Sequence, residues 1–250
     1  ALQYIVLGKY GPLEDARVRQ ALAYAFDYDG YVNGIYKGLF PRAVGVFPKK
    51  LKCHDPNAFM YTTDLDKAKQ LLEEAGVKPG LELRYAIEEG GSPSAGQILQ
   101  AQLAKLGINL KIEQMDSSSY VGIFYGDVQW PERPEIMAWT WWPDYNDPTD
   151  WAWVLFHTDA SGSSGANAGF YSNPRADEIM DIAPTITDEN QLCELYKEFQ
   201  DIVIRQDPAW IPLIEPPDQV IHRKDILGIE MNPLYRGTFD FYKMKRAEGG

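Results

Sequence analysis

The chain has 250 residues, and its 24 lysine and arginine residues stand against 36 aspartate and glutamate residues, for a formal net charge of −12. An acidic surface of this kind repels polyanions, which argues against nucleic acid and anionic membranes as partners. The chain has no apolar run of about 18 residues and no signal peptide at its start, and a strand-like run follows Ala1 so closely that we expect a piece of a longer protein.

The first elements alternate between strand and helix. Residues 4–7 are apolar and predict a strand, and apolar residues at helical spacing over 12–27 predict a core-facing helix with Asp15 as its N-cap. A second short helix is expected over 31–36. The stretch 40–59 carries three prolines and no period, so we expect an extended excursion over the surface.

The middle of the chain has the element order of an α/β protein. A helix is predicted over 64–76, with Asp64 at its start. A strand over 81–87, a helix over 96–107 and a strand over 108–115 follow it. Because short glycine-marked connections separate these alternating elements, we expect a sheet with helices packed on its faces.

The second half offers one more strand and two helices. Residues 135–141 are short and apolar enough for a central strand, which carries the chain to the sheet end where open α/β sheets place ligand-binding loops. Helices are expected over 172–183 and 188–206. From Trp210 onward the tail is strand-like and interrupted by prolines.

The cysteines and histidines give no sign of a metal or redox site. Cys53 and Cys193 are too few for a disulfide scaffold and form no CxxC pair, so we favour free thiols over a bridge between them. His54, His157 and His222 are far apart and match no metal motif. We therefore expect neither a metal nor a cofactor.

The stretch WTWWPDYNDPTDW at 139–151 is the candidate ligand site, since six of the seven tryptophans fall between Trp130 and Trp153. Trp139 and Trp141 share one strand face, and core packing explains at least the first of them. The prolines that follow break the strand and make 142–145 a loop, which favours contact with a ligand. A carboxylate between aromatic walls suits a cation or a polyhydroxylated molecule.

Two rival interpretations concern the carboxylates of this stretch. A calcium loop beginning at Asp144 fails, because it lacks the glycine and the final glutamate that such loops require. A glycoside hydrolase that uses Asp144 with Asp147 or Asp150 stays open as a second function for the same carboxylates.

Several blocks together resemble one family along nearly the whole chain. DARVRQALAYAFDYD, DLDKAKQLLEEAGV, the strand-helix-strand after it and WTWWPDYNDPTDW are similar to the C-terminal half of extracytoplasmic solute-binding proteins of ABC importers, in the dipeptide, oligopeptide and nickel class. The resemblance implies one lobe of a type II periplasmic-binding-protein fold, α/β with a mixed sheet and helices on both faces. Residues 211–250 are then expected to return towards an N-terminal lobe that lies outside residues 1–250.

The resemblance also implies a role for each residue of the site. Asp144 is expected to pair with the α-ammonium group of a peptide, Trp141 to line a side-chain pocket and Trp142 to give a backbone contact. Tyr145 and Asp147 form the turn that presents them. Lys9 stands where many members have a small polar residue, so a contact from the first strand is in doubt. Lys9 is not part of the predicted ligand-binding set, which consists of six residues: Trp139, Trp141, Trp142, Asp144, Tyr145, Asp147.

The implied function is binding without chemistry. We expect a monomer, periplasmic or extracellular, that captures an oligopeptide-like ligand between two lobes and delivers it to a membrane permease. Two further functions stay open on the sequence alone: capture of an oligosaccharide, and service as the ligand-sensing module of a regulator.

Overall fold

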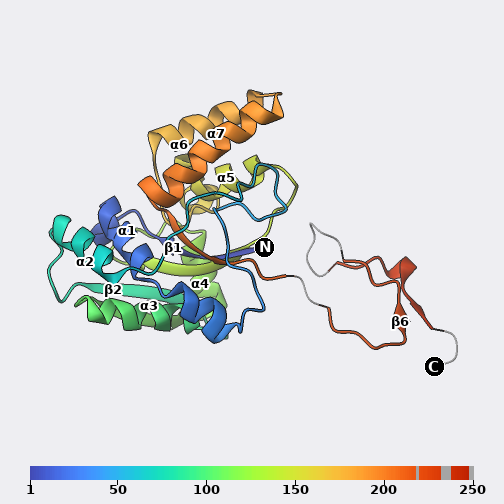
Figure 1. The fold of residues 1–250 in the computed structure, drawn as a ribbon, viewed down its shortest axis with the longest axis horizontal. Helices are drawn as coiled ribbons and strands as arrows, with labels where there is room; N and C mark the ends of the chain where they lie inside the picture. The colour runs from blue at the N-terminus through green and yellow to red at the C-terminus, as the bar shows by residue number, and fades with distance from the viewer. Residues whose placement is uncertain (218–219, 232–237, 248–250) are drawn as a thin grey trace.

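A mixed five-stranded sheet forms the centre of the computed structural model, which describes residues 1–217, 220–231 and 238–247 (Figure 1). The strand order is β3-β2-β4-β1-β5, with β2 parallel to β3 and β4, and β1 antiparallel to β4 and β5. The predicted central strand is therefore confirmed as β4. The strands of this sheet are β1 (Leu2–Leu7), β2 (Glu82–Glu88), β3 (Asn109–Met115), β4 (Ile136–Trp141) and β5 (Trp210–Ile214).

Helices cover both faces of this sheet, as predicted. Tyr85 of β2 packs against Gly96 of α3 and pairs with Ile136 of β4, whereas Trp139 stacks on Phe124 of α4. An odd spacing along a strand reverses the side of the sheet, so α3 and α4 lie on opposite faces. The helices are α1 (Ala16–Ala25), α2 (Leu65–Glu74), α3 (Ser94–Lys105), α4 (Ser117–Phe124), α5 (Pro148–Phe156), α6 (Pro174–Ile182) and α7 (Glu189–Asp201).

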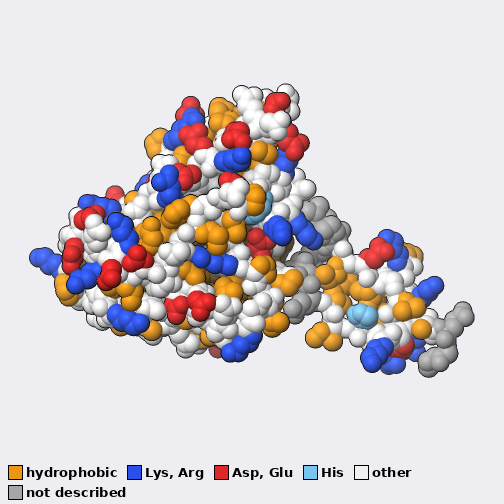
Figure 2. Space-filling view, in the orientation of Figure 1, with side chains coloured by type: hydrophobic (Ala, Val, Ile, Leu, Met, Phe, Trp, Pro, Cys, Tyr) orange, Lys and Arg blue, Asp and Glu red, His pale blue; other side chains and the backbone are white. Residues whose placement is uncertain are grey.

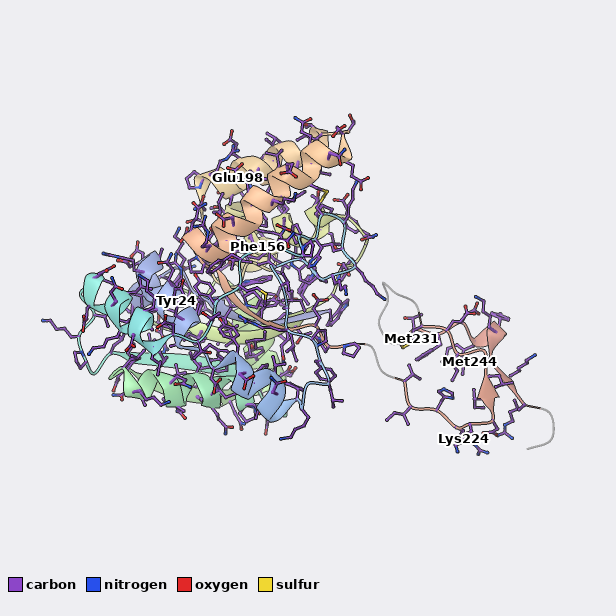
Figure 3. All side chains as sticks on the ribbon, viewed as in Figure 1. Tyr24, Phe156, Glu198, Lys224, Met231 and Met244 are labelled. Carbon is purple, nitrogen blue, oxygen red and sulfur yellow. A yellow bond between two sulfur atoms is a disulfide. The ribbon has the colours of Figure 1, made fainter. Side chains whose placement is uncertain are left out.

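An aromatic layer joins the sheet to α5 and α7. Trp210 of β5 stacks on Tyr4 of β1 with ring centroids 3.6 Å apart. Phe156 of α5, which is labelled in Figure 3, contacts both Trp210 and Phe199 of α7. Tyr4 pairs with Trp139 across the ladder, so the layer continues across that face of the sheet.

Acidic and amide side chains begin most of the helices. The predicted caps are confirmed, since Asp15 accepts from the backbone N–H of Arg17 and Asp64 from that of Lys67, both at 2.8 Å. The expected short helix appears as a π-type turn, Gly30–Ile35. The remaining turns are 3₁₀ turns at Gly11–Leu13, Thr158–Ala160, Gly162–Ser164, Ala183–Thr185 and Phe241–Lys243, and a π-type turn at Ile202–Gln206.

The two cysteines form a disulfide, so the expectation of free thiols is wrong. Cys53 lies in the excursion 40–59, which has neither helix nor strand, and Cys193 lies on α7. Their α-carbons are 4.7 Å apart despite a separation of 140 positions. Only the tertiary fold brings them together, because nothing in the local sequence relates the excursion to α7.

The C-terminal segment lies apart from this body (Figure 1). Its described part, 220–231 with 238–247, contains the short antiparallel pair β6 (Ile226–Leu227) and β7 (Lys245–Arg246). Figure 2 shows hydrophobic side chains on its surface, and Ile221 and Tyr242 are fully exposed. Of the predicted return segment 211–250, the first residues belong to β5, and 218–219, 232–237 and 248–250 lie outside the described residues.

Candidate functional site

Strand β4 carries the tryptophan-rich stretch to one end of the sheet. Trp139 is half-buried and stacks on two rings of α4, with centroids 3.9 Å from Phe124 and 5.7 Å from Tyr120. Trp141 lies on the same strand face, opposite Leu2, and its indole N–H is buried without a hydrogen-bond partner in the described structure. Trp139 is thus mainly a packing residue, while Trp141 leaves an unpaired donor at the site.

The residues after β4 form an open loop, as predicted. Trp142 is 44% exposed and Tyr145 is 52% exposed, and Asp144 between them is also exposed. The Asp144 carboxylate makes no hydrogen bond or ion pair with the described residues. The loop therefore presents a charged group and two aromatic rings to the surroundings.

Asp150, on the first turn of α5, holds the backbone of this loop. Its side chain is 3% exposed, and Oδ2 accepts from the N–H of Asp144 at 2.7 Å and from that of Tyr145 at 3.4 Å. Burial and the charges of Asp144 and Asp147 raise the pKa of the Asp150 carboxyl. Asp147 has a separate structural task, since it caps α5 by accepting from the N–H of Thr149 at 2.9 Å.

Sequence reasoning missed Tyr125, which borders the loop, and gave no structural role to Asn146, which lies within the predicted stretch. Tyr125, at the end of α4, packs edge-on against Trp139, and burial together with the nearby Asp144 charge raises the pKa of its phenol. Asn146 accepts from the backbone N–H of Lys52, beside the disulfide, at 3.3 Å. The sequence gives no signal for either, because both contacts come from segments far away along the chain.

Other residues near the motif or in the first strand do not join the loop. Trp151 is fully buried in the core, and Trp153 stacks on His157 at 5.2 Å. Lys9 lies beyond the end of β1 that pairs with the start of β4, where Nζ contacts Asp207 at 2.8 Å. Because its ammonium group is already paired with Asp207, Lys9 does not contact the loop, in line with the doubt about a ligand contact from the first strand.

The geometry weakens both rival interpretations of the carboxylates. The described residues hold no group of three or more His, Cys, Asp or Glu side chains suited to a metal ion. Asp150 is buried beneath the loop and Asp147 caps a helix, which leaves Asp144 as the open carboxylate of the three. A catalytic pair flanking a substrate is not formed here.

A hollow of about 840 Å³ lies at the opposite end of β4, bordered by β2, β3 and Trp130. Four of its charged groups already pair with one another, Arg84 with Glu135 and Lys111 with Glu113, each at 2.8 Å, while the exposed Glu82 makes no ion pair with the described residues. Most of the charge in the hollow is therefore already balanced by ion pairs.

Comparison with known proteins finds a family profile and relatives whose descriptions all name binding proteins. The profile described as "Bacterial extracellular solute-binding proteins, family 5 Middle" matches residues 2–163. Di/tripeptide-binding protein 2 of Pseudomonas aeruginosa is 30% identical over 243 residues, which cover 94% of this chain and 44% of that protein. The Dipeptide-binding protein of Escherichia coli is 29% identical over 239 residues, covering 92% of this chain and 43% of that protein.

A solved structure has the same fold. The ABC transporter-associated periplasmic binding protein DppA from Helicobacter pylori, in complex with the peptide STSA, superposes with a TM-score of 0.85 and 25% identity, covering 98% of this chain and 47% of that one. The chain thus spans about half the length of the relatives it matches.

Proposed function

The chain belongs to family 5 of the bacterial extracellular solute-binding proteins, and we propose on this premise that it is one lobe of a peptide-capturing component of an ABC importer. The family consists of solute-binding proteins rather than enzymes. Among the described residues, no helix is both long and apolar enough to cross a membrane. The relatives support a periplasmic or extracellular place of action for the whole protein.

One observation carries the proposal of a peptide ligand. The Asp144 carboxylate is exposed and unpaired at a loop whose backbone is fixed from below by Asp150. A fixed carboxylate suits the α-ammonium group of a peptide, since charge-assisted hydrogen bonds are about twice as strong as neutral ones. Trp141, Trp142 and Tyr145 supply the aromatic surface for the adjoining side chains, with Trp139 and Asp147 supporting them from behind.

We propose a second lobe because the matched relatives are about twice as long as this chain. The tail beyond β5 exposes Ile221, Phe241 and Tyr242, large side chains that usually lie against other protein surface. Residues 211–250 then lead back to that lobe. Ligand between the lobes favours the closed form through the contacts it makes only there, and a membrane permease receives the closed monomer.

The test uses the full-length protein and calorimetry with alanyl-alanine. Loss of a hydrogen bond to a charged group costs about 1.5–3 kcal/mol, so Asp144→Asn should weaken binding by about 10-fold to 150-fold. N-acetyl-alanyl-alanine, which lacks the ammonium group, should bind the wild type about as weakly, and the two losses should not add. Glu194→Gln, in an exposed pair on α7, serves as the control and should bind like the wild type.

Three outcomes would count against parts of the proposal. Equal affinity for the free and acetylated dipeptides would remove Asp144 as the ammonium anchor. Tight binding by residues 1–250 alone would contradict the two-lobe arrangement, because losing about 4 kcal/mol of contacts should weaken binding roughly a thousandfold. Binding of an oligosaccharide but of no peptide would favour stacking on the exposed ring of Trp142.

A further inference from the structure

The loop that bears Asp144 rests on a single buried carboxylate. Asp150 is the third residue of α5, and its Oδ2 accepts from the backbone N–H groups of Asp144 and Tyr145 at 2.7 and 3.4 Å. The shorter of these bonds fixes the residue proposed to anchor the ligand. The position of Asp144 therefore depends on the charge state of a neighbour that is itself only 3% exposed.

Apart from the two loop N–H groups, the side chains around Asp150 do little to stabilise its charge. Its acidic neighbours are Asp144 and Asp147, and burial together with these two charges raises the pKa of its carboxyl. Tyr145 is close by in the loop, and Tyr196 of α7 reaches the same turn through Thr149 at 3.3 Å. The turn also approaches Lys52, but that ammonium group lies 3.7 Å from Glu189.

No lysine, arginine or histidine pairs with Asp150 in the part of the chain that the structure describes. The two loop N–H groups and the N-terminal end of α5 are thus the favourable partners of the ionised form. A neutral carboxyl group is a weaker acceptor than a carboxylate. Protonation should therefore loosen the two bonds that hold the loop.

We propose that Asp150 is a positioning residue, which holds Asp144 for the ligand while ionised and releases the loop when it is protonated in acidic medium. The part that concerns the ligand rests on the proposed function. The part that concerns the loop is a property of this chain and can be tested without any ligand.

The first experiment follows the backbone amides of the ¹⁵N-labelled chain from about pH 3 to about pH 8, which brackets the usual carboxyl pKa near 3.9. The amide protons of Asp144 and Tyr145 should shift together, in one step with its midpoint above that usual value. In Asp150→Asn this step should vanish. In Asp144→Asn it should persist at both positions, because the titrating group is not the side chain of residue 144.

A second variant tests the hydrogen bonds themselves. Asp150→Asn keeps an acceptor oxygen, whereas Asp150→Ala removes it, so the Asp144 amide should exchange with solvent about tenfold faster or more in the alanine variant. Amides of β4 should be unchanged in both variants, which shows that the fold is intact. An Asp144 amide that titrates alike in wild type and Asp150→Asn would overturn the proposal, as would one that does not titrate at all.

The ligand part is then measured on the full-length protein with alanyl-alanine. Wild-type affinity should fall as the pH is lowered through the step seen in the amide titration, and Asp150→Asn should lack this step. An affinity profile with the same step in both proteins would contradict the positioning role. If the amide step is present but no peptide binds at any pH, the proposed function fails while the loop mechanism stands.

Discussion

The guanidinium group of Arg19 on α1 donates to the carboxylate of Asp207, just before β5, and Arg19 is completely buried. Asp207 also accepts from Lys9 at 2.8 Å and from Asn173, the cap of α6, at 3.0 Å. The Asp207 carboxylate thus connects the end of β1 with α1, the start of α6 and the start of β5.

Replacing Asp207 by alanine should destabilise the fold by about 3–5 kcal/mol, because it leaves the buried charge of Arg19 without its partner. Chemical denaturation of the purified chain measures this. The control is Glu194→Gln, which breaks an exposed pair with Lys197 and should cost at most about 0.5 kcal/mol. Arg19 also donates to the backbone carbonyl groups of Leu13, Glu14 and Pro208. Similar losses in the two variants would mean that these carbonyl groups alone satisfy its guanidinium group.

The same cluster predicts a loss of stability in acid. Burial alone would raise the pKa of Asp207, but the hydrogen bond from Lys9 and the charge of Arg19 outweigh it, and the pKa is lowered. A lowered folded-state pKa gives stability that is present above the unfolded value of about 3.9 and disappears as the pH falls through the folded value. Denaturation midpoints over this range should therefore fall more steeply for the wild type than for Asp207→Ala.

The disulfide should contribute about 2–5 kcal/mol, since it closes a loop of 140 positions in the unfolded chain. The variant with Cys53→Ser and Cys193→Ser should unfold at correspondingly lower denaturant concentration. Adding a dithiol reductant should shift the wild type to the same midpoint and leave the double variant unchanged. A wild type that is insensitive to reductant under these conditions, with its thiols shown to be free, would refute this contribution.

Alanine substitutions of Trp139 and Trp142 should have different effects, the first on the stability of the fold and the second on ligand affinity. Trp139→Ala removes a half-buried ring stacked on α4 and should destabilise by about 2–4 kcal/mol. Trp142→Ala alters an exposed ring and should change stability by no more than about 0.5 kcal/mol, while lowering ligand affinity of the full-length protein. Denaturation and calorimetry on both variants check this, and a destabilisation by Trp142→Ala equal to that of Trp139→Ala would contradict the assignment.

Local rules predict most of the fold. Asp15 and Asp64 cap their helices because an acidic side chain before an apolar period is a signal contained within a few residues. The same rules do not predict α5, since its sequence continues the tryptophan-rich stretch, which favours a ligand interpretation. They also miss α4, because its serine-rich first turn shows no clear period.

The site is predictable only in part. Pro143 within the loop and Pro148 after it indicate that the chain leaves the strand here, and Trp142 and Asp144 are exposed in the structure. The support from Asp150 does not follow from the sequence, because a run of aspartates gives no indication of which carboxylate turns inward. The disulfide and the Lys52 contact to Asn146 depend on tertiary proximity alone.

The bond between Cys53 and Cys193 closes residues 53–193 into a covalent ring, and the Trp142–Asp147 loop lies on the circumference of that ring. A protease that cuts this exposed loop would open the ring without dividing the molecule in two. The nicked protein would migrate as one species until its sulfur bridge is reduced, and only then would it separate into two fragments. Damage at this exposed loop is thereby prevented from releasing α6 and α7.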